Sequence, residues 1–422
     1  MSDLISHKCP FCGATLEFDI GSQTVRCAYC DNEFSPDEFR ENDEDLEYQD
    51  FELDENAGSE WSEKELYGLS EYQCESCGGD LYTDANTSAT ICPYCGNAVM
   101  LKGRLSGTLK PDRVIPFQKT KEEALEALRV HTNTKRFVHK GFLLDNKLEE
   151  IKGLYVPFWV YDAELEAEVT FNCVDQRTWT VGNTEFTERK YYRVVREGTI
   201  AFDHVPVDGS SKMPDDLMES IEPFEYEMSD DFTTSYLSGY VADKYDVDQD
   251  AARPRARHRM SEETVDEFET TVHYDEIRVS SVDIHPTRSE ASYVMYPVWL
   301  MNTDWNGKKF TFAMNGQTGK IVGNLPADSV KLYGVSAILF TALFLVGLFI
   351  GLSDDEIGLG GAVFGLILGS LAFFVFSHYY TSKLKTVAFQ HGASYYYRQG
   401  SMNITSKEDT FLHKTVTTRK LN

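Results

Sequence analysis

The sequence predicts a multidomain fold: two small β modules, an α+β, strand-rich middle region, a two-helix hairpin and a β-rich C-terminal tail. Two observations carry this prediction. Eight of the nine cysteines form two copies of one spacing pattern near the N-terminus, and two uncharged apolar stretches follow each other toward the C-terminus. At 422 residues, the chain is also longer than one ordinary domain.

The cysteine pattern reads CxxC, fourteen residues, CxxC, and it occurs twice with every position shifted by 65. The eight cysteines are Cys9, Cys12, Cys27, Cys30, Cys74, Cys77, Cys92 and Cys95. Two facing CxxC turns supply four thiolates in the tetrahedral arrangement that Zn²⁺ prefers, and four protein ligands leave no open position for catalysis. We therefore predict two structural Zn²⁺ sites. An iron–sulfur or rubredoxin-like site shares this ligand set, whereas a disulfide framework needs an oxidising compartment and a signal peptide that the first residues do not show.

Short alternating runs between the CxxC turns predict one β-hairpin in each unit. These runs are Thr15–Phe18 with Thr24–Arg26, and Asp80–Tyr82 with Ala89–Ile91. A glycine follows three of the four CxxC turns, where a left-handed backbone is usual. Each unit is therefore predicted to be a zinc ribbon.

The segment between the two units is strongly acidic. Residues 37–66 hold fourteen acidic and two basic side chains, and the whole chain carries a net charge of −28. Such a segment is typical of a disordered linker, although its aromatic residues also fit a segment that folds against a partner. Because neither cysteine unit has a basic face, binding to nucleic acid is disfavoured.

Leu332–Leu352 and Ile357–Ser377 contain no charged residue, and each spans about 31 Å as a helix, enough to cross the hydrocarbon core. An acidic break, Ser353–Glu356, separates them, and lysines flank their outer ends. These features predict a transmembrane hairpin in a multi-pass protein of the cell membrane, with both termini in the cytoplasm. Because neither span holds a charged side chain, we expect an anchor and not an ion pathway.

Glycines spaced four apart mark one stripe on each predicted helix. They are Gly347 and Gly351 on the first helix, and Gly361, Gly365 and Gly369 on the second. Such stripes let helix backbones approach closely in lipid. The stripes are expected to pack the hairpin on itself or, alternatively, to face another membrane protein.

The middle of the chain mixes helix and strand signals. Helices are predicted at 121–133 and 141–152, and strands follow from residue 154, among them 190–196, 199–207 and a meander at 298–323; the tail shows strand patterning at 393–398, 402–404 and 410–418. A Pro-x-Trp motif occurs twice, as Pro157/Trp159 and Pro297/Trp299, which hints at an internal duplication. Prolines within strands suggest edge or first-strand positions.

The sequence gives no persuasive active site, so we predict that the protein is not an enzyme. No GxSxG, HExxH or Walker pattern occurs, and the ten histidines lack metal-ligand spacing. Asp208–Ser211 is more typical of a polar turn than of a nucleophile, and Cys173 of a small buried hydrophobe.

With Tyr155–Trp159, Asn315–Lys320, the cysteine units and the hairpin in this order, the chain resembles a bacterial family of membrane-anchored, transcription-factor-B-type zinc-ribbon proteins. The resemblance implies that the eight cysteines bind zinc. It also implies an adaptor that recruits SPFH (flotillin-like) proteins and phage-shock-protein-A-type proteins in the membrane-stress response. The alternative is a membrane-tethered zinc-ribbon protein that binds nucleic acid or acts in transcription.

In order, the predicted domains are a zinc ribbon at 1–36, an acidic linker at 37–70, a second zinc ribbon at 71–102, a helical segment at 103–153, a β-rich cytoplasmic region with a hint of duplication at 154–330, transmembrane helices at 332–352 and 357–377, and a cytoplasmic tail at 378–422.

Overall fold

The computed structural model describes residues 16–19, 24–27, 33–34, 51–53, 57–84, 87, 89, 91–139, 141–142, 151–352, 359–387 and 392–421. Near the N-terminus, β1 (Leu16–Asp19), β2 (Thr24–Cys27) and β3 (Glu33–Phe34) form a three-stranded antiparallel sheet. The pairing of Leu16 with Cys27 and of Asp19 with Thr24 confirms the hairpin predicted in the first cysteine unit.

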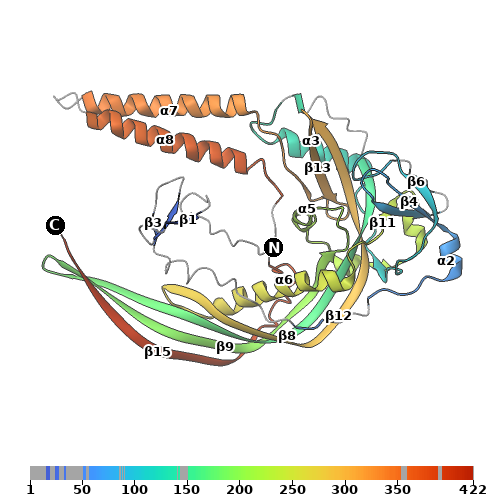
Figure 1. Ribbon diagram of the computed structural model, residues 1–422, viewed down its shortest axis with the longest axis horizontal. Coiled ribbons are helices and arrows are strands. Elements are labelled where there is room, and N and C mark those ends of the chain that lie inside the picture. The colour runs from blue at the N-terminus through green and yellow to red at the C-terminus, as the bar shows by residue number, and fades with distance from the viewer. Residues whose placement is uncertain are drawn as a thin grey trace.

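The other described strands form one sheet of 12 strands (Figure 1). The elements after β3 are α2 (Glu63–Tyr67), β4 (Leu69–Gln73), β5 (Asp80–Asp84), β6 (Met100–Arg104), β7 (Arg113–Val114), α3 (Lys121–Asn133), β8 (Ile151–Val181), β9 (Thr184–Asp208), α5 (Asp215–Ser220), β10 (Asp230–Asp231), β11 (Val241–Asp243), α6 (Gln249–Glu269), β12 (Glu276–Trp305), β13 (Lys308–Asn315), β14 (Ile321–Gly323), α7 (Ser329–Leu352), α8 (Leu359–Ser382) and β15 (Asn403–Lys420).

Strands β8, β9, β12 and β15 extend from the central body as a long curved arm (Figure 1). The sequence predicted several short strands here, but β8 and β9 pair without interruption from Trp159 and Val207 to Val181 and Thr184, apart from one bulge. The predicted strand at 393–398 is wrong, because the tail forms its strand only from Asn403. Helix α6 covers the concave side of the arm (Figure 1), where Ala256, Met260 and Phe268 are buried.

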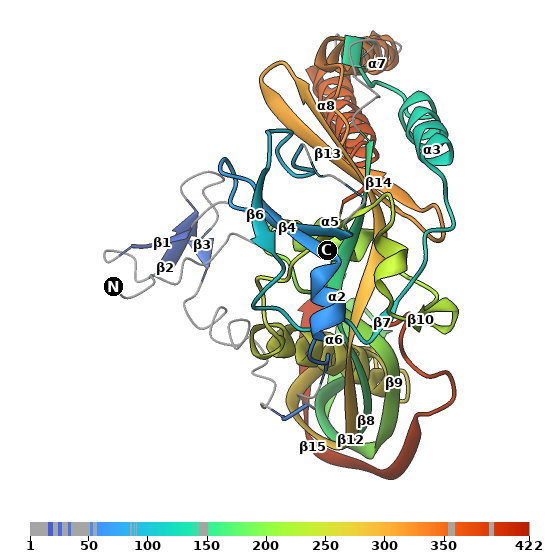
Figure 2. The same cartoon turned by 90° about the vertical axis from the view of Figure 1, so that its right-hand side faces the viewer.

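The central body is built from two halves with the same order of elements. One half is β7–α3–β8–β9, and the other is β11–α6–β12–β13. Strand β7 pairs in parallel with β12, through Arg113 and Val294, whereas β11 pairs in parallel with β8, through Val241 and Leu154. Each half therefore gives its first strand to the hairpin of the other half, and the two halves interlock. Figure 2 shows α3 and α6 at opposite ends of the sheet.

The two Pro-x-Trp motifs occupy equivalent places at the crossing of these halves. The Trp159 indole N–H donates to the Val247 carbonyl at 3.0 Å, and the Trp299 indole N–H donates to the Lys119 carbonyl at 2.8 Å. Val247 and Lys119 each directly precede the N-cap residue of a helix, α6 or α3. Each tryptophan thus fixes the start of the other half's helix.

The prolines of these motifs lie neither at the edge of the sheet nor at the first position of a strand, so that prediction is wrong. Pro157 lies where the neighbour of β8 changes from β11, which pairs as far as Tyr155, to β9, which pairs from Phe158. Pro297 lies at the matching change from β7 to β13 on β12. At either point, no backbone N–H is needed for a hydrogen bond to the neighbouring strand. An interior strand therefore tolerates proline there.

The predicted disordered linker is wrong for residues 51–53 and 57–70. Phe51, Leu53 and Ala57 are buried in the main core. The Trp61 ring lies edge-on to Phe232, with centroids 5.8 Å apart. The described part of the acidic segment therefore folds back on its own chain, because its apolar side chains pack into the core there.

The predicted helix at 121–133 is confirmed to the residue as α3, which a capping box of Thr120 and Glu123 begins. The predicted helix at 141–152 is wrong at its end, since Ile151 already belongs to β8. The predicted meander is confirmed: Asn306 and Gly307, both with positive φ, turn β12 into β13, and β13 pairs with β14.

Candidate metal centre and membrane hairpin

The four cysteines of the second unit meet in one cluster, with all four sulfurs within 4.8 Å of one another. The Cys74 and Cys95 sulfurs are 3.5 Å apart, and those of Cys77 and Cys92 are 3.6 Å apart. A tetrahedral Zn²⁺ site with Zn–S bonds of about 2.3 Å needs sulfurs roughly 3.8 Å apart. The residues present therefore fit a four-thiolate metal site.

Backbone hydrogen bonds give both CxxC turns the same shape. Gly78 N–H donates to the Cys74 carbonyl at 2.8 Å, and Gly96 N–H donates to the Cys92 carbonyl at 3.0 Å. The φ angles of Gly78 and Gly96 are 71° and 74°, in the left-handed region. The role predicted for these two glycines is confirmed, since a side chain would strain the turn.

The thiols of the cluster differ in acidity. Burial raises the pKa of Cys92. Burial alone would also raise the pKa of Cys95, but hydrogen bonds from the backbone N–H and side-chain amide of Asn97 lower it to about 7. Metal binding to the full set therefore releases protons, as is usual for cysteine sites.

The second CxxC turn is fastened to the central sheet. Asn302 of β12 donates from its side-chain amide to the carbonyls of Pro93 and Tyr94, at 2.6 and 3.1 Å, and accepts a bond from Thr311 at 2.8 Å. The Tyr94 ring packs against a hydrophobic core cluster that includes Leu81 and Val156. Burial raises the pKa of the Tyr94 hydroxyl well above its usual value. The second CxxC turn is thus part of the central body.

The hairpin predicted within the second cysteine unit is wrong. Strand β5 pairs with β4, which precedes the first CxxC turn, and with β11, where Tyr82 faces Ala242. Ile91 instead forms an isolated bridge with Ala98. Local alternation predicted the strands, but pairing with β11 depends on residues far along the chain.

Of the four cysteines in the first unit, the structure describes only Cys27, and only its backbone, at the end of β2. Cys9, Cys12 and Cys30 lie outside the described residues, so the first metal site stays a prediction. Among the described residues, no second group of cysteine, histidine or acidic side chains lies at metal-binding distances.

Cys173 and the Asp208–Ser211 turn, which the sequence raised as candidate nucleophiles, both lie in surroundings that suit a structural role. Cys173 is buried, and burial raises its pKa to about 11, which suits a small apolar side chain and not a nucleophile. Ser211 donates its backbone N–H to Asp246 at 2.7 Å, and Gly209 N–H donates to the Pro157 carbonyl at 2.8 Å. Asp208–Ser211 therefore belongs to the crossing of the two halves. Asn315–Gly316 is its counterpart, because Gly316 N–H donates to the Pro297 carbonyl at 2.8 Å.

Helices α7 and α8 are each long and apolar enough to cross a membrane, over Ser329–Ile350 and Gly360–Ser382. Their outward side chains are exposed: Val330, Ile338, Leu371, Phe349 and Phe374 are all more than half accessible. Apolar surface of this extent needs lipid or a protein partner. The predicted second span ends at Ser377, five residues before α8 ends at Ser382, whereas its predicted start at Ile357 lies outside the described residues.

The glycine stripes face each other inside the hairpin. A Cβ on Gly347 would overlap the Gly365 backbone, and a Cβ on Gly369 would lie 3.0 Å from the Phe340 carbonyl oxygen. Ser336 and Ser377 add a hydroxyl contact of 2.8 Å between the helices. Of the two expectations for the stripes, packing of the hairpin on itself is the one that the contacts match.

No family model and no solved structure matches the chain. It is 36% identical over 354 residues to "Uncharacterized protein YdjG" of Bacillus subtilis (strain 168). That alignment covers 82% of this chain and 99% of the relative.

Proposed function

This chain belongs to the family of Bacillus subtilis YdjG, and we propose that it is a membrane-anchored adaptor that holds protein partners at the cytoplasmic face of the cell membrane. In this proposal both CxxC units bind structural Zn²⁺, α7 and α8 span the membrane, and both termini are cytoplasmic. The resemblance to membrane-anchored zinc-ribbon proteins supplies the partner class: SPFH-type and phage-shock-type proteins.

One observation carries the proposal: a closed four-cysteine cluster is fixed to the same body that leads into the hairpin. Asn302 holds the second CxxC turn on β12, and β12 continues through β13 and β14 toward α7. A four-thiolate site has no coordination position for a substrate, so its use is to hold a small rigid surface. Such a surface on a membrane-tethered body suits recruitment better than chemistry.

The test is affinity purification of the full-length protein from detergent-solubilised membranes. The variant Cys77→Ser/Cys95→Ser should bind one zinc ion fewer per chain than the wild type and lose its protein partners. Cys173→Ser, which changes the cysteine outside the two units, is the matched control and should retain both zinc and partners. Recovery of the same partners from a folded variant that lacks this metal would exclude the second unit from partner binding.

The same preparation tests the alternative. A transcription-related protein would bind DNA or RNA in a salt-sensitive way. Such binding by the purified wild-type protein, without enrichment of a protein partner, would favour that alternative.

A further inference from the structure

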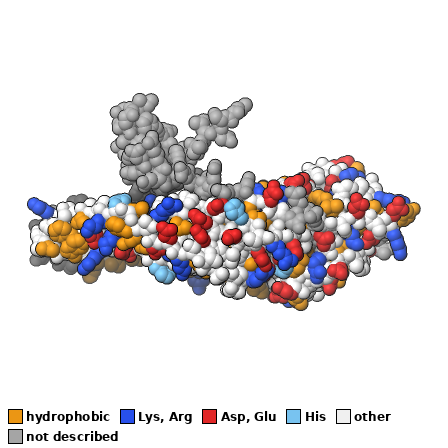
Figure 3. Space-filling model, turned by 90° about the horizontal axis from the view of Figure 1, so that it is seen from below, with side chains coloured by type: hydrophobic (Ala, Val, Ile, Leu, Met, Phe, Trp, Pro, Cys, Tyr) orange, Lys and Arg blue, Asp and Glu red, His pale blue; other side chains and the backbone are white. Residues whose placement is uncertain are grey.

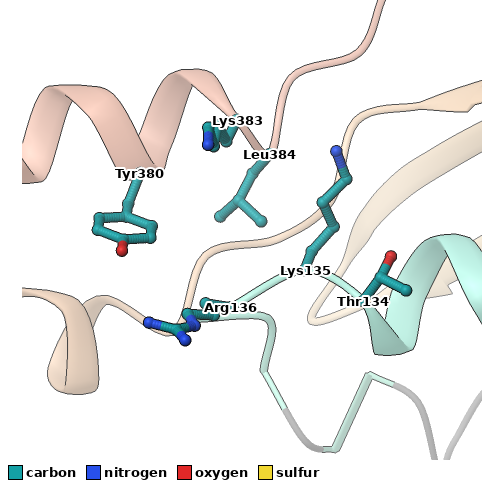
Figure 4. Close-up of a pocket in the computed structure, with 6 residues that line it drawn as sticks. All are labelled: Thr134, Lys135, Arg136, Tyr380, Lys383 and Leu384. Atoms are coloured by element: carbon teal, nitrogen blue, oxygen red, sulfur yellow. The ribbon is translucent and has the colours of Figure 1, made fainter.

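A cavity of about 260 Å³ lies between the end of α3 and the end of α8. Its lining residues are Thr134, Lys135, Arg136, Tyr380, Lys383 and Leu384 (Figure 4). The lining therefore brings three cationic side chains together and includes no carboxylate.

The segment after α3 is fastened to the base of the hairpin. Phe137, with a φ of 65°, places its ring 4.9 Å from the Tyr380 ring and 6.1 Å from the Phe376 ring, centroid to centroid. The Phe137 carbonyl accepts a bond of 2.6 Å from the Asp328 N–H, and Val138 bridges to Ala327. These contacts hold Lys135 and Arg136 beside the last turn of α8.

The cations of this cavity are unpaired among the described residues. No ion pair joins Lys135, Arg136 or Lys383 to a described carboxylate, whereas nearby Lys331 pairs with Asp328 at 2.6 Å. Lys383 instead lies over the Tyr379 ring, 4.3 Å from its centroid. Three like charges around one hollow create a positive potential that favours an anion between them.

The cavity lies where a membrane would place phosphate groups. Lys383 directly follows the apolar span that ends at Ser382, and Tyr379 and Tyr380 lie in the last turn of that span. Tyrosines and basic residues at the end of a spanning helix mark the boundary between hydrocarbon and headgroups. Arginine and lysine in a pocket at this depth are suited to the phosphate of a lipid headgroup.

From these observations we propose that this cavity, which we call the basal pocket, binds the headgroup of an anionic phospholipid. Lipid binding at the basal pocket requires membrane insertion of the hairpin, as in the proposed function, but it does not require recruitment of protein partners. Its three cations, its interfacial tyrosines and its position at the end of the span all match that ligand.

The test uses the full-length protein, purified in neutral detergent and mixed with phosphatidylglycerol or phosphatidylcholine, with bound lipid counted by native mass spectrometry. The wild type should retain phosphatidylglycerol in preference to phosphatidylcholine. Lys135→Gln/Arg136→Gln should bind phosphatidylglycerol roughly ten- to thirtyfold more weakly, because each cation near anionic lipid contributes a factor of several. Lys407→Gln/Lys420→Gln, which removes two exposed cations from β15, is the matched control and should bind like the wild type.

Equal retention of the two lipids by the wild type would overturn the proposal. Equal phosphatidylglycerol binding by the pocket variant and the control would also overturn it. Displacement of the lipid by millimolar inorganic phosphate would assign the pocket to a free anion instead. Partner recovery, measured separately on the same pocket variant, distinguishes failure of the adaptor function from failure of lipid binding.

Discussion

Replacement of Arg259 by methionine should destabilise the central body strongly. Arg259 on α6 forms a two-pronged ion pair with Glu222, with N–O distances of 2.6 and 3.1 Å, and donates to the Pro206 carbonyl at 2.7 Å. The side chains of Arg259 and Glu222 are 3% and 1% exposed, so solvent does not screen them. Removal of one partner of such a pair leaves a buried charge and costs about 3–5 kcal/mol.

The destabilisation should depend on pH. Burial raises the pKa of Glu222 above its usual value of about 4.5, and Arg259 partly offsets this effect. In Arg259→Met the offset is lost, so the pKa rises further. A carboxyl whose pKa is raised on folding favours the folded state below its unfolded pKa and opposes it as the pH rises through its folded pKa. The variant should therefore be closest to the wild type near pH 4.5 and lose stability from there upward.

The assay is thermal unfolding of the detergent-solubilised protein, followed by circular dichroism between pH 4.5 and 8. At pH 8 we expect Arg259→Met to lower the Tm by roughly 6–20 °C, at about 2–4 °C per kcal/mol for a body of this size. Arg288→Met is the control, because Arg288 and Glu290 form an exposed pair, which contributes at most about 1 kcal/mol. Arg259→Met/Glu222→Gln should recover most of the loss and show none of the additional pH dependence of Arg259→Met. A loss no larger than that of the control, or no recovery in the double variant, would refute the reasoning.

Three further predictions concern the hairpin, the interlocked halves and the metal centre. Gly365→Leu should separate α7 from α8, because its side chain would meet the α7 backbone; disulfide trapping between cysteines placed on the two helices should fall, and unchanged trapping would contradict the packing. Trp299→Phe should lower stability by about 1 kcal/mol, because the Lys119 carbonyl loses its indole donor, and a Tm equal to the wild type would show that this bond contributes nothing. Asn302→Ala should speed zinc transfer to a chromogenic chelator severalfold, because the second CxxC turn loses two hydrogen bonds, and a wild-type rate would show that the turn is held by other contacts.

Local signals predicted the features that depend on neighbouring residues. The helix at 121–133, the meander at 298–323 and the glycines of the CxxC turns each depend on residues close in the sequence, so the sequence located them well. The cysteine spacing likewise predicted which four side chains meet in the second unit.

Features that depend on distant residues were missed. The interlocked halves need β7 to reach β12 and β11 to reach β8, and no local pattern specifies such partners. Helix α6 was missed because it buries small residues such as Ala252 and Ala256 among arginines and contains Pro254, so its apolar stripe is weak. The paired Pro-x-Trp motifs indicated a duplication, and the Asp-Gly or Asn-Gly at the end of each following strand is the further signal that would have strengthened it.

The directions of the hairpin and the arm set a geometric condition on membrane insertion. Figure 1 shows that α7, α8 and the arm leave the central body on the same side. Figure 3 shows charged side chains along the arm, and exposed Glu168, Arg177 and Lys414 are among its residues. A bilayer around an upright hairpin would place these charges at hydrocarbon depth, at a cost of several kcal/mol each. If the hairpin inserts, the angle between hairpin and arm must therefore open at the base, so that the arm lies along the membrane surface.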